Sequence, residues 1–436
     1  MAATRTTTSR AATLLTSLPA LLGAETPQRY LLAFESLSEA RATGGLISIY
    51  GILEARDGKV DLKDVGPMAR ILPPGGFDPV EAPDSFEAAY SNQLATTQFQ
   101  QVNVSPNFPQ VARVLGRMYE AHNGRAVDGV IALDPVSLER LLESMGSIDL
   151  PEWGDTITSE NAVQRILHDS YLRYEDPDTQ ARYLADIIEA FWLRVSEGDL
   201  DPVAFLDALG EISRTRHLKV FHSDVETERA MRTLNLAGGY GTAQQNVQMV
   251  FHNNYSVNKV DYFLQRDVAT DIQLGADGSA QVEVTMRLEN SAPGGPPSNL
   301  LGPGVDGDPP GLNRMMLNVL LPTGARPSEM RVNGRSTSAL QYMDGAHPVM
   351  WTVVEIPAGE TVIATTTYAL PNAATVSGKT GEFQMRFVPQ AAVNPDSYTV
   401  TVLPPDGWSL DGASRFTTSG TLDQRRVVDL EMQVDD

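Results

Sequence analysis

A glutamate and an arginine beside a glycine pair form the segment best suited to binding an anion. Glu39 and Arg41 lie two residues apart, and Gly44 and Gly45 follow closely. A guanidinium can hold a phosphate through two parallel hydrogen bonds, and glycines let the backbone approach a ligand. The alternative is an internal ion pair that fixes a turn. This segment is therefore a candidate binding site for a small anion.

Two asparagines and a second arginine extend the candidate site. Asn103 and Asn107 flank a Ser-Pro pair directly before a predicted helix, and Arg113 lies about one turn into that helix. Amide groups can bind ligand hydroxyls, and a helix N-terminus offers free N–H groups to an anion. The alternative, which the sequence favours, is that one asparagine only caps the helix. The candidate ligand-binding residues are Glu39, Arg41, Gly44, Gly45, Asn103, Asn107 and Arg113.

The sequence lacks the residues or motifs required for cysteine chemistry, for common zinc sites and for a serine hydrolase. The chain has no cysteine, which excludes thiolate catalysis, disulfides and cysteine-based zinc sites. Its six histidines form no HExxH pair, and no G-x-S-x-G elbow is present. Asp128 and Asp134 stand at opposite ends of a short predicted strand, about 20 Å apart, so they cannot share one ion. We therefore predict no metal site from these residues and read each aspartate as a strand-end or turn residue.

The net charge of the chain limits its partners. The formal charge is -22 at pH 7. Binding to nucleic acid requires clustered lysines and arginines, and anionic lipid surfaces repel an acidic protein. We therefore expect neither nucleic acid nor an anionic membrane surface as a partner.

The first half of the chain alternates strands with helices. Strands are predicted at Tyr30–Phe34 and Leu46–Ile52, on either side of the charged turn that carries the first candidate residues. Helical periodicity follows at Phe108–His122, and Leu218–His222 reads as a returning strand. This pattern predicts an α/β domain over residues 29–260, with helices packed on a mixed central sheet.

The second half reads as strands only. Short alternating segments recur from residue 261 to 436, with Pro and Gly between them about every 8 to 12 residues. Asp271–Leu274 and Ala280–Leu288 flank a Gly-Ala-Asp-Gly turn, as in a hairpin. The pattern predicts an all-β, immunoglobulin-like sandwich.

The first 28 residues are predicted to form an amphipathic helix that packs on the first domain. Their leucines recur at three and four residues, with Thr and Ser on the other face. A membrane span needs about 20 apolar residues, and no segment of the chain reaches that length.

Several motifs resemble a bacterial envelope family catalogued as domain of unknown function 4012. They are Arg29-Tyr30-Leu31, Glu39 to Gly45, Asn103 to Pro109, Val127 to Pro135, and the pair Asn253-Asn254 with Asn258 to Tyr262. The resemblance runs from about residue 29 to 265. The family usually has a Gln-Asn pair where this chain has Glu35-Ser36.

This resemblance implies an extracytoplasmic location at the cell surface. Members of the family usually carry a membrane helix upstream, so the resemblance implies a tether outside this chain. A looser similarity links the chain to the LytR–CpsA–Psr phosphotransferases, which attach lipid-linked polymers to the cell wall. It implies Mg²⁺ as cofactor, and cell-wall or lipid-linked polysaccharide as partner. The hallmark Arg-x-Asp-Thr of those enzymes is not present, because Arg41-Ala42-Thr43 lacks the acid.

Two functions therefore stay open. One is a binding or transfer role in the assembly of a surface glycopolymer. If the protein is a phosphotransferase, the looser similarity implies that Arg41 and Arg113 stabilise diphosphate charge and that Glu39 holds Mg²⁺ or acts as base. The other is a non-enzymatic structural or adhesive surface module. Whether the protein is an enzyme is not decided by its sequence.

Overall fold

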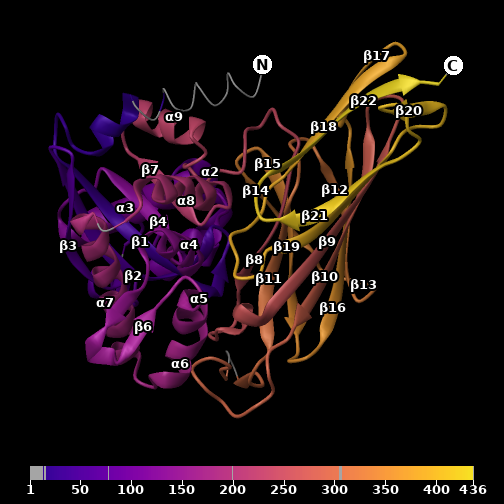
Figure 1. Ribbon diagram of the computed structural model, residues 1–436. Helices are drawn as coiled ribbons and strands as arrows, with labels where there is room; N and C mark the ends of the chain where they lie inside the picture. Colours follow the sequence, from indigo (N-terminus) through magenta and orange to yellow (C-terminus); the bar gives the residue numbers. More distant parts are fainter. Residues whose placement is uncertain (1–12, 14–15, 77, 199, 304–306, 436) are drawn as a thin grey trace. The chain divides into compact units, whose positions relative to one another are not determined.

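The computed structural model describes residues 13, 16–76, 78–198, 200–303 and 307–435. The chain divides into two compact units, Met1–Gly239 and Tyr240–Asp436 (Figure 1). The first unit mixes helices with a sheet, and the second consists largely of strands. The coarse order predicted from the sequence, α/β followed by β, is confirmed.

A five-stranded sheet forms the centre of the first unit, in the order β3-β2-β1-β4-β7. The pair β1 and β4 is parallel, whereas the other pairs are antiparallel, so the sheet is mixed as predicted. A separate two-stranded sheet joins β5 to β6. The strands are β1 Gln28–Arg41, β2 Gly44–Arg56, β3 Lys59–Pro67, β4 Gly129–Leu133, β5 Ile148–Leu150, β6 Asp155–Ile157 and β7 Leu218–His222.

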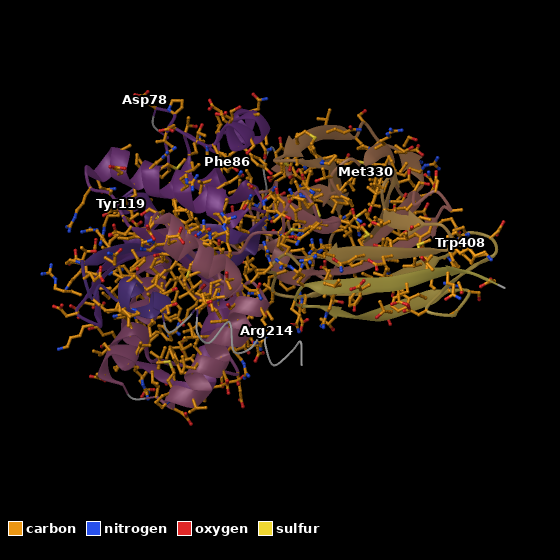
Figure 2. All side chains as sticks on the ribbon, turned by 90° about the horizontal axis from the view of Figure 1, so that it is seen from above. Asp78, Phe86, Tyr119, Arg214, Met330 and Trp408 are labelled. Carbon is orange, nitrogen blue, oxygen red and sulfur yellow. The ribbon has the colours of Figure 1, made fainter. Side chains whose placement is uncertain are left out.

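The helices of this unit bury one face each. In α3, for example, Val111, Leu115 and Met118 are fully buried, because residues three and four apart share a helix face. Side chains fill the space between helices and sheet, among them Phe86 and Tyr119 (Figure 2). The helices are α2 Asp84–Tyr90, α3 Phe108–Asn123, α4 Pro135–Met145, α5 Ala162–Gln164, α6 Ser170–Arg173, α7 Pro177–Glu197, α8 Pro202–Arg214 and α9 Val225–Thr233, with a π-helical turn at Arg165–Asp169 and 3-10 turns at Met68–Arg70, Ser91–Gln93, Phe99–Val104 and Pro151–Trp153.

The free edge of β7 is covered by the chain that follows α9. The backbone N–H of Val220 donates to the carbonyl of Leu236 at 2.8 Å. An uncovered edge strand presents unpaired backbone groups that can pair with another chain. The segment from Leu234 to Ala237 therefore closes this side of the sheet.

The predicted N-terminal helix falls mostly outside the described residues. Residues 16–21 are helical, and Leu21 packs against a small core formed by Ala230, Met231 and Ala237. The Tyr30 hydroxyl also donates to the carbonyl of Leu21 at 2.8 Å. The described end of this segment thus packs on α9 and β1. In the part of the chain that the structure describes, no helix has the length and apolar character to cross a bilayer.

Two sheets make up the second unit and share one hydrophobic core. One sheet has seven strands and the other eight, and buried residues of both, such as Val284 and Leu317, lie in the same core. Met330 and Trp408 mark this unit in Figure 2. The strands are β8 Val247–Asn254, β9 Leu264–Leu274, β10 Ala280–Asn290, β11 Asn313–Leu320, β12 Arg326–Val332, β13 Arg335–Ser336, β14 Leu340–Asp344, β15 His347–Ile356, β16 Thr361–Leu370, β17 Ala374–Ser377, β18 Thr380–Phe387, β19 Asp396–Leu403, β20 Trp408–Leu410, β21 Phe416–Leu422 and β22 Arg426–Val434, with a 3-10 turn at Val260–Phe263.

The sequence places the boundary between the domains near residue 260, and the structure places it between Gly239 and Tyr240. The difference arises from β8, which precedes residue 260 but pairs with β11 and β18 of the second unit. All eight residues of β8 are buried, so the strand lacks the alternation that marks β9 and β10.

Candidate functional site

The charged turn predicted around Glu39 and Arg41 is a continuation of strand β1. Both residues lie in β1, whereas Gly44 and Gly45 open β2, and Arg41 pairs with Gly44 across a two-residue turn. The pairing register shifts between Phe34 and Glu35 and again before Ala40, and these irregularities carry the strand beyond its apolar part. The prediction that these residues form a turn is therefore wrong.

The Arg41 guanidinium faces groups of its own unit. Its Nε donates to the carbonyl of Gln100 at 3.2 Å, its Nη1 donates to the carbonyl of Ala40 at 3.0 Å, and its Nη2 lies 3.7 Å from Glu39. Glu39 and Arg41 are 7% and 5% exposed. This arrangement is the internal ion pair that the sequence offered as the alternative. A ligand-binding role for the pair stays a prediction.

The glycine pair serves close packing. A Cβ on Gly45 would lie 2.0 Å from the carbonyl oxygen of Ser36, and a Cβ on Gly44 would lie 2.2 Å from Oε2 of Glu35. Asn103 is fully buried, and its Nδ2 donates to the carbonyl of Gly45 at 2.6 Å. Asn103 therefore contacts the end of the β1–β2 hairpin.

A buried ion pair that the sequence analysis missed lies beside this hairpin. Lys219 of β7 donates from Nζ to Oε2 of Glu35 at 2.8 Å and to the carbonyl of Arg216 at 3.0 Å. Both side chains of the pair are 0% exposed, and Nζ lies 5.9 Å from the centre of the Phe108 ring. Removing two charges from water is costly unless they are paired, so the two residues depend on each other.

Burial controls the protonation of Glu35. Its pKa rises from 4.5 to about 7 because burial disfavours the carboxylate, and Asp134 adds to the rise. Lys219 and the Asn103 amide act in the opposite direction. The carboxyl group thus changes protonation near neutral pH.

The two aspartates at the ends of β4 hold neighbouring backbone groups in place. Asp134 caps α4 by accepting from the Ser137 N–H at 3.0 Å, and it also bonds Nδ1 of His217 at 2.7 Å. Asp128 accepts from the backbone N–H of Arg29 at 2.7 Å. Both aspartates therefore act as strand-end or turn residues, as the sequence predicts. Within the described ranges, no group of three or more His, Asp or Glu side chains could hold a metal ion.

The last two candidate residues belong to α3, Asn107 at its N-cap and Arg113 in its second turn. Asn107 stands at the N-cap of α3 but makes no capping hydrogen bond with its side chain. Arg113 is exposed and lies over the Phe221 ring, 5.7 Å from its centre. Through β4, Phe221 is level with Leu31 of β1, four residues or about 13 Å from Glu35. That Arg113 and Arg41 share a ligand stays a prediction.

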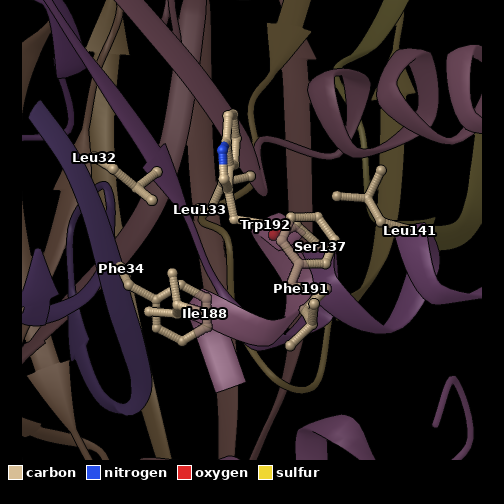
Figure 3. A pocket seen from close by; sticks show the side chains of 9 residues that line it. Leu32, Phe34, Leu133, Ser137, Leu141, Ile188, Phe191 and Trp192 are labelled. Atoms are coloured by element: carbon tan, nitrogen blue, oxygen red, sulfur yellow. The ribbon is translucent and has the colours of Figure 1, made fainter. Parts of the chain in front are cut away.

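An apolar pocket lies between the sheet and two helices (Figure 3). Its cavity volume is about 30 Å³, which suits a thin apolar group and not a sugar ring. The indole N–H of Trp192 is buried and donates to no described residue. Ser137 is engaged, because its hydroxyl donates to the carbonyl of Asp134 at 2.5 Å. The lining residues come from β1, β4, α4 and α7: Leu32, Phe34, Leu133, Ser137, Leu138, Leu141, Ile188, Phe191 and Trp192.

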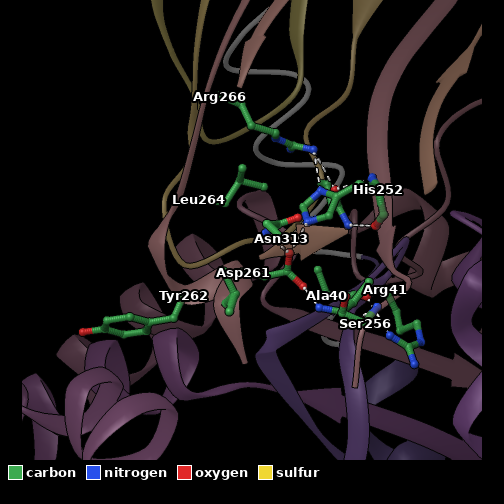
Figure 4. A network of polar contacts seen from close by, with 12 residues as sticks. Ala40, Arg41, His252, Ser256, Asp261, Tyr262, Leu264, Arg266 and Asn313 are labelled. Atoms are coloured by element: carbon green, nitrogen blue, oxygen red, sulfur yellow. Dashed lines mark hydrogen bonds and ion pairs between the residues drawn. The ribbon is translucent and has the colours of Figure 1, made fainter. Parts of the chain in front are cut away.

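A second polar network is buried inside the β-rich unit. His252 of β8 lies between Asp261 and Arg266 (Figure 4). Its Nδ1 lies 2.9 Å from Nη1 of Arg266, which can only donate, and its Nε2 lies 3.2 Å from Oδ1 of Asp261. Arg266 also donates to Asp396 at 2.7 Å, and burial raises the pKa of Asp396. The network joins β8, β9 and β19.

The comparison with protein families confirms the predicted resemblance in part of the chain. Residues 25–171 match the family described as protein of unknown function (DUF4012). This range contains β1, the hairpin, Asn103 and Asp134. It ends before the later segments that the sequence analysis also compared with the family. No curated protein matches the chain.

Several solved structures are similar to parts of the chain. A protein of Legionella pneumophila, described as a candidate nutrient binding protein, is 10% identical, with 43% of this chain and 70% of that chain covered and a TM-score of 0.26. An M1 zinc metallopeptidase of Deinococcus radiodurans is 16% identical, with 39% and 42% covered and a TM-score of 0.22. Leukotriene A4 hydrolase of Saccharomyces cerevisiae is 7% identical, with 41% and 30% covered and a TM-score of 0.24. Likenesses this distant carry no argument about fold or activity.

Proposed function

We propose that this chain is an extracytoplasmic protein of the bacterial cell envelope that binds a lipid-linked glycopolymer during surface assembly. The proposal is a binding role first. A transfer step like that of the LytR–CpsA–Psr enzymes receives less support, because Arg41 is bonded within its own unit and Arg113 lies apart from it. The upstream membrane tether belongs to the same proposal.

The observation that carries the proposal is the apolar pocket with one unpaired donor. Leucine and aromatic side chains line it, so it favours an alkyl or isoprenoid chain over a polar group. The Trp192 N–H, which lacks a partner among the described residues, would donate to the first oxygen of the lipid headgroup. The narrow volume admits only the thin end of such a chain unless α4 and α7 separate.

An aromatic surface group supports the glycan part of the proposal. Trp153, Tyr174 and Tyr183 contact one another at centroid distances of 5.0 to 5.3 Å, and Trp153 and Tyr174 are partly exposed. Arg173 lies over Tyr174 and bonds Asp155 at 3.2 Å. Aromatic faces with polar groups at their rim can stack on sugars and bind their hydroxyls.

The test is a calorimetric titration of the full chain with farnesyl phosphate as the probe. We expect saturable binding that Leu141→Trp weakens at least about tenfold, because the larger side chain fills the pocket. The matched control is Leu206→Trp on α8, whose native side chain is 60% exposed. Absence of binding, or equal loss in both variants, would exclude the pocket as a lipid site.

The second candidate is a non-enzymatic structural or adhesive surface module. The closed ion pair at Glu39 and Arg41 and the extensive β-rich unit favour it. The immunoglobulin-like character of that unit also remains a proposal. A core shared by two sheets supports a sandwich, but seven and eight strands exceed the roughly 7 to 9 in total of an immunoglobulin domain.

A further inference from the structure

Three fully buried side chains with complementary chemistry meet at the end of the β1–β2 hairpin. Glu35, Asn103 and Lys219 are each 0% exposed. Lys219 bonds Glu35 through Nζ at 2.8 Å, and the Asn103 amide is near enough to the same carboxyl group to lower its pKa. An amine, a carboxyl group and a carboxamide are the groups that amide exchange between side chains requires.

The two glycines place these groups against one short piece of backbone. The Cβ position of Gly44 is 2.2 Å from Glu35 Oε2 and 3.4 Å from Lys219 Nζ. The carbonyl of the next residue, Gly45, holds the Asn103 amide at 2.6 Å. The amine and the amide therefore lie on neighbouring residues of the same hairpin end, inside a region closed to water.

Among the described residues, two buried oxygens here have no hydrogen-bond donor. Neither Oε1 of Glu35 nor Oδ1 of Asn103 accepts a bond from any described residue. Two acceptors cannot satisfy each other, whereas a proton on Glu35 would turn one of its oxygens into a donor. The raised pKa of Glu35, about 7, is consistent with such a proton.

In the inference that follows, Lys219 would supply that proton through its contact with Glu35. Transfer from Nζ to Glu35 converts a buried ion pair into a neutral amine and a neutral acid, which lowers the cost of burial. The neutral amine is a nucleophile, and a protonated Glu35 polarises the Asn103 carbonyl.

From this arrangement we propose that Lys219 and Asn103 form an intramolecular isopeptide bond, with Glu35 as the group that moves the protons. Nζ attacks Cγ of Asn103, the new C–N bond forms, and the Cγ–Nδ2 bond breaks. Nδ2 leaves as ammonia with a proton relayed from Nζ through Glu35. No oxidant or reductant takes part, and the carboxyl group is regenerated.

The bond would join the 3-10 turn before α3 to strand β7. It would close a loop from residue 103 to residue 219 in a chain that has no cysteine for a disulfide. A covalent link of this kind restricts the unfolded chain, as a disulfide does. It would also explain why a glutamate and a lysine are buried together with two unsatisfied acceptors beside them.

The test is the intact mass of the folded full chain, followed by proteolytic peptide mapping. We expect the mass to fall below the sequence mass by one molecule of ammonia, and a branched peptide that contains both Asn103 and Lys219. Glu35→Gln keeps both reacting groups but removes the proton carrier, so its mass should equal its sequence mass. Lys63→Met, at an exposed position, is the control and should keep the loss.

Two results would overturn the inference. One is a folded native chain at its full sequence mass, which needs no variant and is unaffected if a variant fails to fold. The other is a loss of ammonia found only in linear peptides, since an asparagine can lose ammonia by cyclising on its own backbone. Both readouts are independent of farnesyl phosphate binding, so the proposed function stands or fails separately.

Discussion

At the scale of single residues, the end of the β1–β2 hairpin requires glycine, because a Cβ atom would clash there. Gly45 lies so close to Ser36 that a methyl group has no room, and the clash is with backbone, which cannot rotate away. The candidate residues Glu39, Arg41, Gly44, Gly45 and Asn103 are brought together by this packing. This close packing explains why the segment is buried.

We predict that Gly45→Ala destabilises the protein by at least about 1–3 kcal/mol, the usual cost of overpacking. Gly75→Ala is the matched control, because no heavy atom lies within 4 Å of the new Cβ. Urea unfolding of both variants measures the difference. Equal stabilities would show that the hairpin relaxes around the methyl group.

The buried pair leads to a prediction about pH. In chains where Lys219 is not linked to Asn103, Lys219→Met leaves Glu35 buried without its cation, which should cost about 3–5 kcal/mol when Glu35 is charged. Since the folded pKa of Glu35 is raised from 4.5 to about 7, its protonation stabilises the fold at low pH, and this contribution is lost as pH rises between those values. Lys219 lowers the pKa of Glu35, so in the variant the loss of stability continues to a higher pH.

The variant should therefore lose much less stability at about pH 5 than at about pH 8, measured by urea unfolding of variant and native chain. Lys63→Met removes the same charge from an exposed site and should be nearly neutral at both pH values. A pH-independent loss in Lys219→Met would mean that lost packing or a lost link to Asn103, rather than the uncompensated charge, causes it.

At the scale of elements, the sequence predicts regular segments well and irregular ones poorly. The hairpin of β9 and β10 has inward apolar residues at every second position, so its pattern is visible. The end of β1 was predicted as a turn because Ser38, Glu39 and Arg41 are polar, yet all are buried. Tertiary burial overrides the local signal there.

The candidate site was predicted only in part, because contacts between residues far apart in the sequence leave no local signal. Its hairpin residues and Asn103 could be found from local motifs. Lys219 is a lone lysine in an otherwise apolar strand, which is the one signal that could have found it. Its partner Glu35 lies 184 residues earlier, and nothing local in the sequence pairs two positions so far apart.

A helix cap gives a prediction at this scale. Asp201 begins α8 and accepts hydrogen bonds from the N–H groups of Val203 and Ala204 at 2.9 and 3.1 Å. Asp201→Ala should cost about 1 kcal/mol, because those donors lose their partner. Asp207→Ala, on the exposed side of the same helix, removes the same charge and no cap. Thermal unfolding that ranks Asp207→Ala as the more harmful change would contradict this account.

At the scale of the whole molecule, the net charge of -22 acts against compactness. Added salt should therefore raise the melting temperature. From about 0.01 M to about 0.15 M, the Debye length falls from about 30 Å to about 8 Å, so repulsion between distant carboxylates weakens. Calorimetric scans of the full chain at both ionic strengths measure the shift. A fall in melting temperature would mean that surface ion pairs outweigh the general repulsion.

The segment that runs along β7 also affects association between molecules. A central sheet with an open border offers a template on which the backbone of another copy can continue the hydrogen-bond ladder. Here the Leu236 carbonyl already occupies that border beside Val220. Growth of the sheet from one molecule to the next at β7 would first require this segment to detach from Val220.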